Sequence, residues 1–318
     1  MTRVGTALFN CMGGCLRSDG GYDFRRLQRA AADLDAAPAL WLINEAKLWR
    51  ANANVGLHGA AEALSDELGV PYVGVLGTCP RGPIPPAIVY DPTVLVLRTW
   101  WNPDDPYGYA DKLNVARFAV RDSAPDGDSR AEFLTWVDHW HPDSGTIRRQ
   151  EAARLSRYGR DTRLPVIGGG DLNANASGPH LPQRDWTVAS SQRRSAEARR
   201  LPDGTWVADT EAVDHLLGYW DGDRRVAGCG YHAIAELAWQ TGSATALLPT
   251  VNNNIDSGGA IIKDWLVANP AMVPYVDPHS YRVHIPSGDP ANWPSDHRLV
   301  TAAFDLAETC PPLGGEPR

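Results

Sequence analysis

The sequence predicts one large α/β domain, and three observations support this prediction. Strand-like and helical segments alternate from the first residues onward, which is the pattern of α/β folds. The chain has 318 residues, enough for two average domains or for one two-sheet domain with a deep core. Its residues are 43% hydrophobic and 21% charged, an ordinary composition for a globular protein.

Short strands separated by two helices are predicted for the first part of the chain. The helices have apolar residues at a spacing of three and four, and Pro38 ends the first of them. Turns rich in proline and glycine, such as CPRGPIPP, separate the later strands. The predicted helices are residues 24–34 and 56–68. The predicted strands are residues 4–10, 40–43, 72–76, 87–90, 94–98 and 115–120.

The second part continues this alternation and then departs from it. A strand at 133–139, a helix at 146–158 and a strand at 164–169 precede a glycine-rich turn, GGGD. Residues 177–254 break the rhythm with arginine pairs, several aromatics and a helical stretch at 231–239. No clean linker flanks this segment, so we interpret it as an insertion in a single domain of residues 1–308. The last strands are predicted at residues 261–268, 281–285 and 299–306, before a frayed tail of residues 309–318.

Charge and cysteine usage exclude some classes of protein. A net charge of −8 argues against a protein that coats nucleic acid with a basic surface, but not against a local grip on phosphates. The cysteines are odd in number and scattered, so they do not form a disulfide framework. Cys11 and Cys15 lack a second pair nearby to complete a zinc site, and we expect buried free thiols.

The N-terminal residues and the length of the apolar runs bear on localisation. The first residues lead directly into a strand without an apolar signal stretch, and no apolar run approaches the length of a membrane span. We therefore expect a cytoplasmic protein with no membrane partner. The sequence offers no reason to infer an obligate protein partner.

Six short polar pieces carry the candidate chemistry, and each lies at the end of a predicted strand. Polar residues at the ends of buried strands line one rim of a sheet, where loops assemble sites. The pieces are Phe9-Asn10, INE at 43–45, DHWH at 138–141, GGDLN at 169–173, KDWLV at 263–267 and PSDHRLV at 294–300.

Each piece alone has an ordinary structural explanation. Asn10 suits a turn, and Glu45 suits a helix cap. GGGD has neither the GxGxxG spacing of a dinucleotide site nor the GK[ST] of a P-loop, so we discard both nucleotide interpretations. His139 and His141 form a conceivable zinc pair, but no HExxH or cysteine partner supports it.

In their order along the chain, the six pieces resemble the motif series of the endonuclease/exonuclease/phosphatase superfamily. The resemblance spans Asn10 to His297, and GDLN and SDHRLV are its most specific parts. It implies a deoxyribonuclease I-like fold, a two-sheet, four-layer α/β sandwich with mixed, mostly antiparallel sheets. It also implies a divalent-metal-dependent phosphodiester hydrolase.

The resemblance assigns roles to particular residues. A phosphodiester resists attack because its oxygens are charged and its leaving alkoxide is poor, so a hard cation held by oxygen ligands is required. Glu45, with Asn10 beside it, matches the pair that holds Mg²⁺, for which Mn²⁺ is a possible substitute. Asp296 matches a residue near the metal. Asp171 matches the carboxylate that orients or deprotonates water, and Asn173 matches its positioning amide.

The remaining assignments concern the phosphate. His297 matches the histidine that contacts the scissile phosphate, and Asp264 matches the carboxylate that favours its protonated form. His139 matches a mid-chain histidine that donates to a phosphate oxygen, although His141 is an alternative. Asp256 lies just upstream of Asp264 and is an alternative for its role. The run WLVANP continues after Asp264 as the family's strand does, which favours Asp264.

The substrate class stays open among three hypotheses. Nucleic acid, cut as by an endonuclease or exonuclease, is the leading one. The arginines of the insertion would suit backbone contact, although they would equally suit a solvated face; they are Arg193, Arg194, Arg199 and Arg200. A small-molecule or lipid phosphoester is the alternative. An inactive binding scaffold is the third, and the presence of every expected residue type argues against it.

Overall fold

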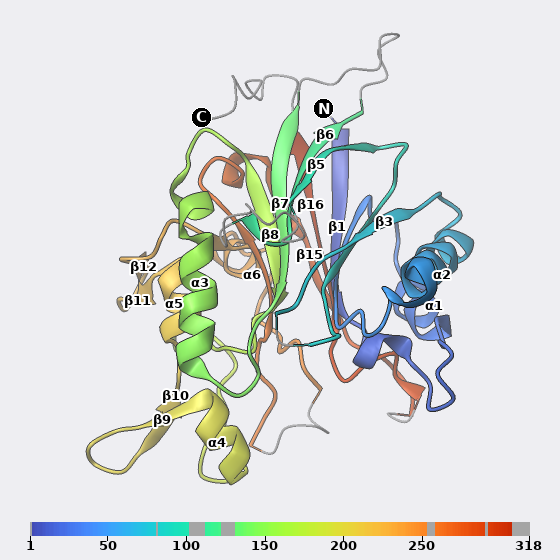
Figure 1. Cartoon of the computed structure of the whole chain (residues 1–318). Helices are drawn as coiled ribbons and strands as arrows, with labels where there is room; N and C mark the ends of the chain where they lie inside the picture. Colours follow the sequence, from blue (N-terminus) through green and yellow to red (C-terminus); the bar gives the residue numbers. More distant parts are fainter. Residues whose placement is uncertain are drawn as a thin grey trace.

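Two six-stranded sheets packed against each other form the centre of the molecule, with helices on both outer faces (Figure 1). The computed structural model describes residues 2–80, 82–101, 112–121, 131–252, 258–289 and 292–306. The predicted four-layer α/β sandwich with mixed, mainly antiparallel sheets is confirmed.

The first sheet has the strand order β15-β16-β1-β2-β4-β3. Its neighbours pair antiparallel except for β1 and β2, which run parallel. Its strands are β1 (Thr2–Asn10), β2 (Leu40–Asn44), β3 (Val73–Leu76), β4 (Ala87–Tyr90), β15 (Val276–His284) and β16 (Leu299–Leu306).

The second sheet has the order β13-β14-β8-β7-β6-β5. It repeats the pattern of the first, because only β7 and β8 in it run parallel. Its strands are β5 (Leu95–Trp101), β6 (Val115–Val120), β7 (Glu132–His139), β8 (Val166–Asp171), β13 (His232–Ala233) and β14 (Asp264–Ala268).

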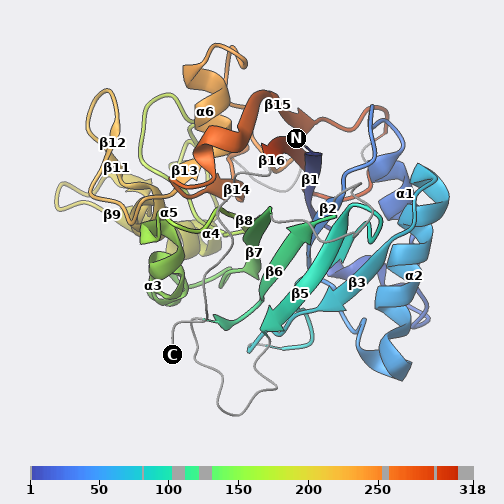
Figure 2. The same cartoon turned by 90° about the horizontal axis from the view of Figure 1, so that it is seen from above.

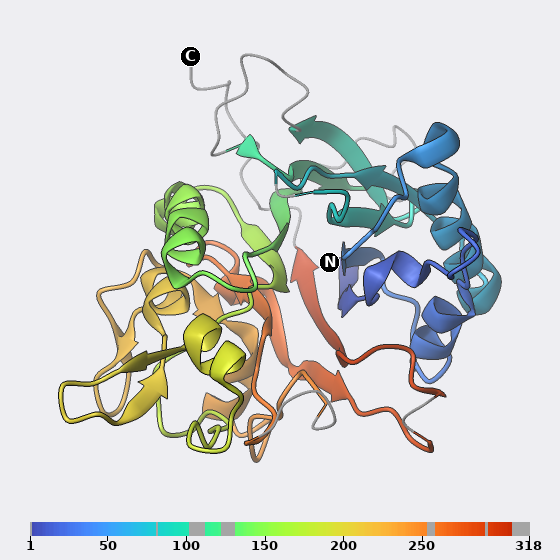
Figure 3. The same ribbon diagram turned by 60° about the horizontal axis from the view of Figure 1, so that its bottom comes forward.

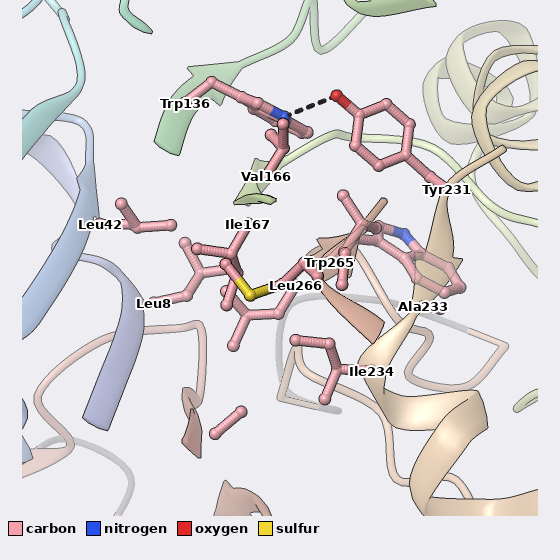
Figure 4. Packing of buried hydrophobic residues seen from close by; sticks show 14 of the residues in the cluster. Leu8, Leu42, Trp136, Val166, Ile167, Tyr231, Ala233, Ile234, Trp265 and Leu266 are labelled. Carbon is pink, nitrogen blue, oxygen red and sulfur yellow. Dashed lines mark hydrogen bonds between the residues drawn. The ribbon is translucent and has the colours of Figure 1, made fainter. Parts of the chain in front are cut away.

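The main core fills the space between the two sheets (Figure 4). Leu8 and Leu42 of the first sheet join one buried cluster with Ile167 and Leu266 of the second. Trp41, one position along β2, belongs to the cluster on the other face, beneath the helices. Central strands buried on both faces are apolar at every position, which explains the continuous apolar run at 40–43.

Helices cover both outer faces of the sandwich (Figures 1 and 2). The first sheet is covered by α1 (Arg25–Ala31) and α2 (Ala51–Leu68), and the second by α3 (Gly145–Arg160) and α5 (Glu211–Leu217). Ser144 starts α3, because its Oγ accepts the backbone N–H of Ile147 at 3.3 Å. Within the described ranges, no helix combines the length and apolar character that crossing a membrane requires.

The glycines before Asp171 lie inside β8, so the predicted glycine-rich turn is wrong. A Cβ atom on Gly168 would lie 2.3 Å from the Trp136 ring, and one on Gly170 would lie 1.7 Å from the Asp138 carbonyl oxygen. Neither distance leaves room for a methyl group. The glycines thus allow β7 and its aromatic side chain to pack closely against β8.

Residues 177–252, the described part of the segment predicted to be an insertion, form short elements attached to the second sheet. The helix α5 packs on α3, and β13 pairs with β14. The predicted helix at 231–239 begins only at Ile234, as α6 (Ile234–Gln240), because the two preceding residues pair as a strand. The other elements are α4 (Ser191–Glu197), β9 (Ala198–Arg200), β10 (Trp206–Ala208), β11 (Tyr219–Trp220) and β12 (Arg225–Val226).

Candidate active site

Strand direction brings the six polar pieces to one edge of the sandwich, the edge that comes forward in Figure 3. The parallel pair β1–β2 ends with Asn10 opposite Asn44, and the parallel pair β7–β8 ends with His139 opposite Asp171. The antiparallel strand β14 begins at this edge, with Asp264 opposite Asp171. The strand β16 also runs antiparallel to β1, so the residues before it, including His297, lie at the same edge.

A buried asparagine joins the two sheets at this edge. Asn44 Nδ2 donates to the Asp138 carbonyl at 2.8 Å, and Asn44 Oδ1 accepts the backbone N–H of Asp171 at 2.7 Å. The side chain is fully buried, so both bonds form away from water. Asn44 therefore fixes the carboxylate-bearing end of β8 relative to β2. Sequence reasoning missed it, although a polar residue that ends a wholly buried apolar strand is a recognisable signal.

Glu45, Asn10 and Asp171 converge. Asn10 Nδ2 donates to Glu45 Oε1 at 3.2 Å and to Asp171 Oδ2 at 3.0 Å. The backbone N–H of Gly13 donates to Glu45 Oε2 at 2.6 Å. Asn10 Oδ1 accepts the backbone N–H of Met12 at 2.9 Å, so the amide nitrogen is the group that faces the two carboxylates.

The donor set suits a hard divalent cation. Glu45, His139 and Asp171 each offer a ligand atom, and these atoms lie within 4.8 Å of one another. Carboxylate oxygens are the ligands that Mg²⁺ and Mn²⁺ prefer. Asn10 would add an oxygen if its amide turned over, because the nitrogen now occupies the position between the carboxylates. The carboxylate of Asp296 accepts from Ser295 Oγ at 3.2 Å.

His297 lies between two carboxylates. Its Nδ1 is 2.8 Å from Asp264 Oδ2, and its Nε2 is 3.6 Å from Asp171 Oδ2. Burial opposes protonation of the ring, but the negative charges of Asp264 and Asp171 outweigh it and raise the pKa of His297 to about 10. The ring is therefore an imidazolium at neutral pH. It holds one proton on each nitrogen, and Nε2 faces the centre of the cluster.

Asp171 is held in its charged form. Burial alone would raise the pKa of this carboxyl, but its electrostatic interactions with His297, His139 and Lys263 lower it. The backbone N–H of Asn173 donates to Asp171 Oδ1 at 3.0 Å, and Asn173 Nδ2 donates to the Trp140 carbonyl at 3.1 Å. A buried carboxylate is thus fixed among several donors.

The structure distinguishes the two histidines at the end of β7. His139 Nε2 lies 3.7 Å from Asp171 Oδ2. His141 lies beyond the end of the strand, where its Nδ1 accepts the backbone N–H of Asp143 at 3.1 Å. The geometry therefore brings His139 into the cluster. Asp256, the alternative to Asp264, lies outside the described residues.

The four arginines of the insertion have other surroundings. Arg193 Nη1 donates to Glu197 Oε1 at 2.8 Å, one helical turn away. Arg194 Nη1 donates to the carbonyl of Ala189 at 2.7 Å and also bonds two neighbouring carbonyls. Arg199 and Arg200 lie on β9 with exposed side chains. These contacts are local, and within the described part of the chain the arginines do not join the carboxylate–histidine cluster.

A buried ion-pair cluster that sequence reasoning missed links the insertion to the site. Lys263 Nζ lies 2.7 Å from Glu197 Oε1, and Arg184 Nη1 lies 2.6 Å from Glu197 Oε2, with all three side chains buried. Lys263 immediately precedes Asp264 on the chain, and its charge helps to lower the pKa of Asp171. A lysine inside the apolar run AIIKDWLVA was the available signal.

Comparison with known proteins gives similarity in structure only. No protein-family model matches the chain, and no curated protein sequence matches it. An endonuclease/exonuclease/phosphatase family protein from Bacteroides thetaiotaomicron is 18% identical, with a TM-score of 0.53 over 96% of this chain and 99% of that one. An AP endonuclease from Archaeoglobus fulgidus is 16% identical, with a TM-score of 0.53 over 95% and 99%.

A third solved structure is TDP2 from D. rerio, complexed with a single-strand DNA product. It is 11% identical to this chain, with a TM-score of 0.52 over 96% of this chain and 100% of that one. These likenesses show that the chain has the fold of endonuclease/exonuclease/phosphatase family proteins, as the six pieces predicted.

Proposed function

We propose that this chain, which has the endonuclease/exonuclease/phosphatase fold and this cluster of side chains, is a divalent-metal-dependent phosphodiester hydrolase. One observation carries the proposal. Glu45, Asp171 and the Asp264–His297 pair come from both sheets and converge at one edge. Burying two carboxylates and a charged imidazole together is costly, and such clusters occur where chemistry requires them.

Glu45 and Asn10 are the residues that we propose to hold Mg²⁺ or Mn²⁺, with Asp171 beside them. A cation bound there would neutralise charge on the phosphate and on the leaving oxygen. The hydrogen bond from Gly13 fixes Glu45 Oε2, while Asn10 orients the second carboxylate oxygen. The fold therefore sets the position and orientation of the carboxylates of Glu45 and Asp171.

Asp171 is the proposed acceptor for the attacking water. Its carboxylate is charged, buried and held through Oδ1 by the Asn173 backbone. A water that donates to this carboxylate would be oriented for attack and would pass a proton to it as the bond to phosphorus forms. The amide of Asn173, turned toward the Trp140 carbonyl, fixes the turn that follows the strand.

His297 is the proposed donor to the scissile phosphate. Its Nδ1 proton bonds Asp264, so the Nε2 proton is available for a phosphate oxygen that enters the cluster. An imidazolium in a buried site stabilises the additional charge that develops as the phosphate is attacked. His139, across Asp171 from His297, is proposed to donate to a second oxygen.

Nucleic acid is the proposed substrate class. The D. rerio TDP2 structure holds a single-strand DNA product in the same fold, and the exposed Arg199 and Arg200 suit contact with a phosphate backbone. A small phosphoester is the second candidate. It is favoured by the local contacts of Arg193 and Arg194 and by the net charge of −8.

A panel of substrates tests the proposal. Purified protein is incubated with plasmid DNA, RNA, an abasic duplex, an aryl phosphodiester and an aryl phosphomonoester, each with Mg²⁺, Mn²⁺ or EDTA. Metal-dependent cleavage of a diester that EDTA abolishes is the expected result. Activity on the monoester alone would replace the diesterase by a phosphatase, and the absence of cleavage throughout would favour a binding scaffold.

A further inference from the structure

Two loops beside the proposed metal site each expose one large apolar side chain. Met12 follows β1 and is 42% exposed, while Leu48 follows β2 and is 41% exposed. Both have a left-handed backbone, with φ of 44° and 59°. A bulky residue adopts this conformation at a cost that glycine or asparagine avoids. Such strain accumulates where the position of a side chain matters.

Hydrogen bonds from a neighbouring segment hold both strained residues in place. Arg26 Nη1 donates to the Met12 carbonyl at 3.4 Å, and its Nη2 contacts the Met12 sulfur at 3.6 Å. Tyr22 Oη donates to the Leu48 carbonyl at 2.9 Å. The two backbones are therefore fixed while their side chains remain partly exposed to solvent.

These loops pack against each other around Glu45. The N–H of Gly13, next to Met12, donates to Glu45 Oε2 at 2.6 Å. Trp49, next to Leu48, donates from Nε1 to the Gly14 carbonyl at 2.9 Å. Both loops therefore border the carboxylate that is proposed to bind the metal. A group attached to the scissile phosphate of a bound diester would lie beside these loops.

We propose that Met12 and Leu48 form a nonpolar platform for the base of the nucleotide that carries the scissile phosphate. This inference rests on the proposed function and makes nucleotide diesters the preferred substrates. Thioether and aliphatic side chains pack well on aromatic ring faces, and such contacts tolerate any base. The guanidinium of Arg26, beside Met12, has no carboxylate contact among the described residues and adds positive charge for a phosphate.

The test compares two diesters with the same leaving group. Thymidine 5′-(4-nitrophenyl phosphate) carries a base, whereas methyl 4-nitrophenyl phosphate does not. The wild-type protein with Mg²⁺ or Mn²⁺ is expected to prefer the nucleoside ester in kcat/KM. In the double variant Met12→Asn with Leu48→Asn, this preference is expected to fall about tenfold, the value of one well-buried apolar contact. Asparagine tolerates the left-handed backbone, so the change removes apolar surface without adding strain.

Control variants separate the possible outcomes. Val73→Thr removes a comparably exposed apolar group on β3, 42% exposed, and is expected to keep the wild-type preference. Met12→Leu retains an apolar side chain and is expected to keep most of it, which excludes a general folding effect. If the double variant is active and keeps the wild-type preference, the platform proposal is wrong and the proposed function stands. Absence of metal-dependent turnover of both esters by the wild type would overturn the proposed function.

Discussion

The edge of the sandwich that holds the site and the arginine pair Arg193–Arg194 satisfy their charged groups in opposite ways. At the edge, Asp171 on β8 meets His297, which lies more than a hundred residues further along the chain, and Asn10, which comes from the other sheet. In the insertion, Arg193 pairs with Glu197 on the same helix, and Arg194 bonds nearby carbonyls. Local pairs of this kind are common wherever a helix or turn needs to be secured.

The difference separates chemistry from scaffolding. Distant charged groups converge in a buried place only when the whole fold keeps them there, and their desolvation costs free energy. Arginines that bond groups close to them in sequence need no further function. The edge is therefore the stronger candidate for catalysis, and the following variants sharpen or break this contrast, from the largest expected effect to the smallest.

Glu45→Gln should have the largest effect on activity. It keeps the shape of the side chain but removes the charge of the proposed metal ligand, so diesterase activity should fall by about three orders of magnitude. Circular dichroism should show an intact fold. The matched control is Glu62→Gln on the exposed face of α2, which should keep its activity. Wild-type activity of Glu45→Gln at low Mg²⁺ would contradict the assignment.

Glu197→Gln tests the buried link between the two regions. It removes the charge that pairs with Lys263, Arg184 and Arg193. Buried cations left without this partner should lower the free energy of unfolding by about 3–5 kcal/mol. Urea denaturation monitored by tryptophan fluorescence measures the decrease. Glu211→Gln, an exposed residue of α5, is the control, and equal unfolding midpoints for the two variants would show that the cluster contributes little.

Asp264→Asn should change the titration of His297. Without this carboxylate the imidazolium is less stable, so the pKa of His297 should fall from about 10, and burial will then favour the neutral ring. NMR titration of the histidine measures the shift, and activity should fall about tenfold to a hundredfold. If Asp256→Asn shifts the pKa and Asp264→Asn does not, the supporting role belongs to Asp256.

The raised pKa of His297 also affects stability. Because the folded-state pKa of His297 exceeds the ordinary value of 6.5, its contribution is fully present below about pH 6.5 and disappears as the pH rises toward 10. Thermal unfolding of the wild type should therefore show a decrease in stability across this window. In Asp264→Asn the decrease should end at a lower pH, because the folded-state pKa is lower, and should be smaller.

The four arginines should have the smallest effect. Replacing Arg193, Arg194, Arg199 and Arg200 with alanine should weaken nucleic-acid binding severalfold and flatten its salt dependence, because fewer bound phosphates release fewer counterions. Turnover of a small aryl diester should change little. The pair Arg199→Ala with Arg200→Ala should account for most of the weakening, because both residues are exposed, whereas Arg193 pairs with Glu197 and Arg194 bonds three carbonyls. An unchanged salt slope would mean that the arginines are a solvated face.

The sequence predicted the regular part of the molecule well, for a physical reason. Strands such as β2 are buried on both faces, so their apolar runs are visible without knowledge of their neighbours. The positions of polar residues at the ends of such strands led to the prediction of Asn10, Asp171 and the other residues at this edge. The two-sheet sandwich with mixed, mostly antiparallel sheets came from the resemblance of six ordered motifs, whereas the order of the strands came from the structure.

Contacts between distant segments could not be predicted in the same way. Asn44 acts through bonds to β7 and β8, and Glu197 through Lys263, and neither partner is near in sequence. The first residues of the predicted helix at 231–239 pair with β14 instead, because tertiary pairing overrides local preference. Residues of the insertion form short elements whose patterns are too brief to recognise.

The glycine run of β8 would mislead a mutational scan. Substitutions at Gly168 and Gly170 would collide with the Trp136 ring and the Asp138 carbonyl. A map of tolerated substitutions would therefore mark these positions as intolerant to the same degree as Asp171. The glycines would then look like part of the catalytic apparatus, although they bring no reactive group to it. Here the intolerance would come from the close packing of two strands. Only assays that measure the yield of folded protein separately from turnover would distinguish these glycines from catalytic residues.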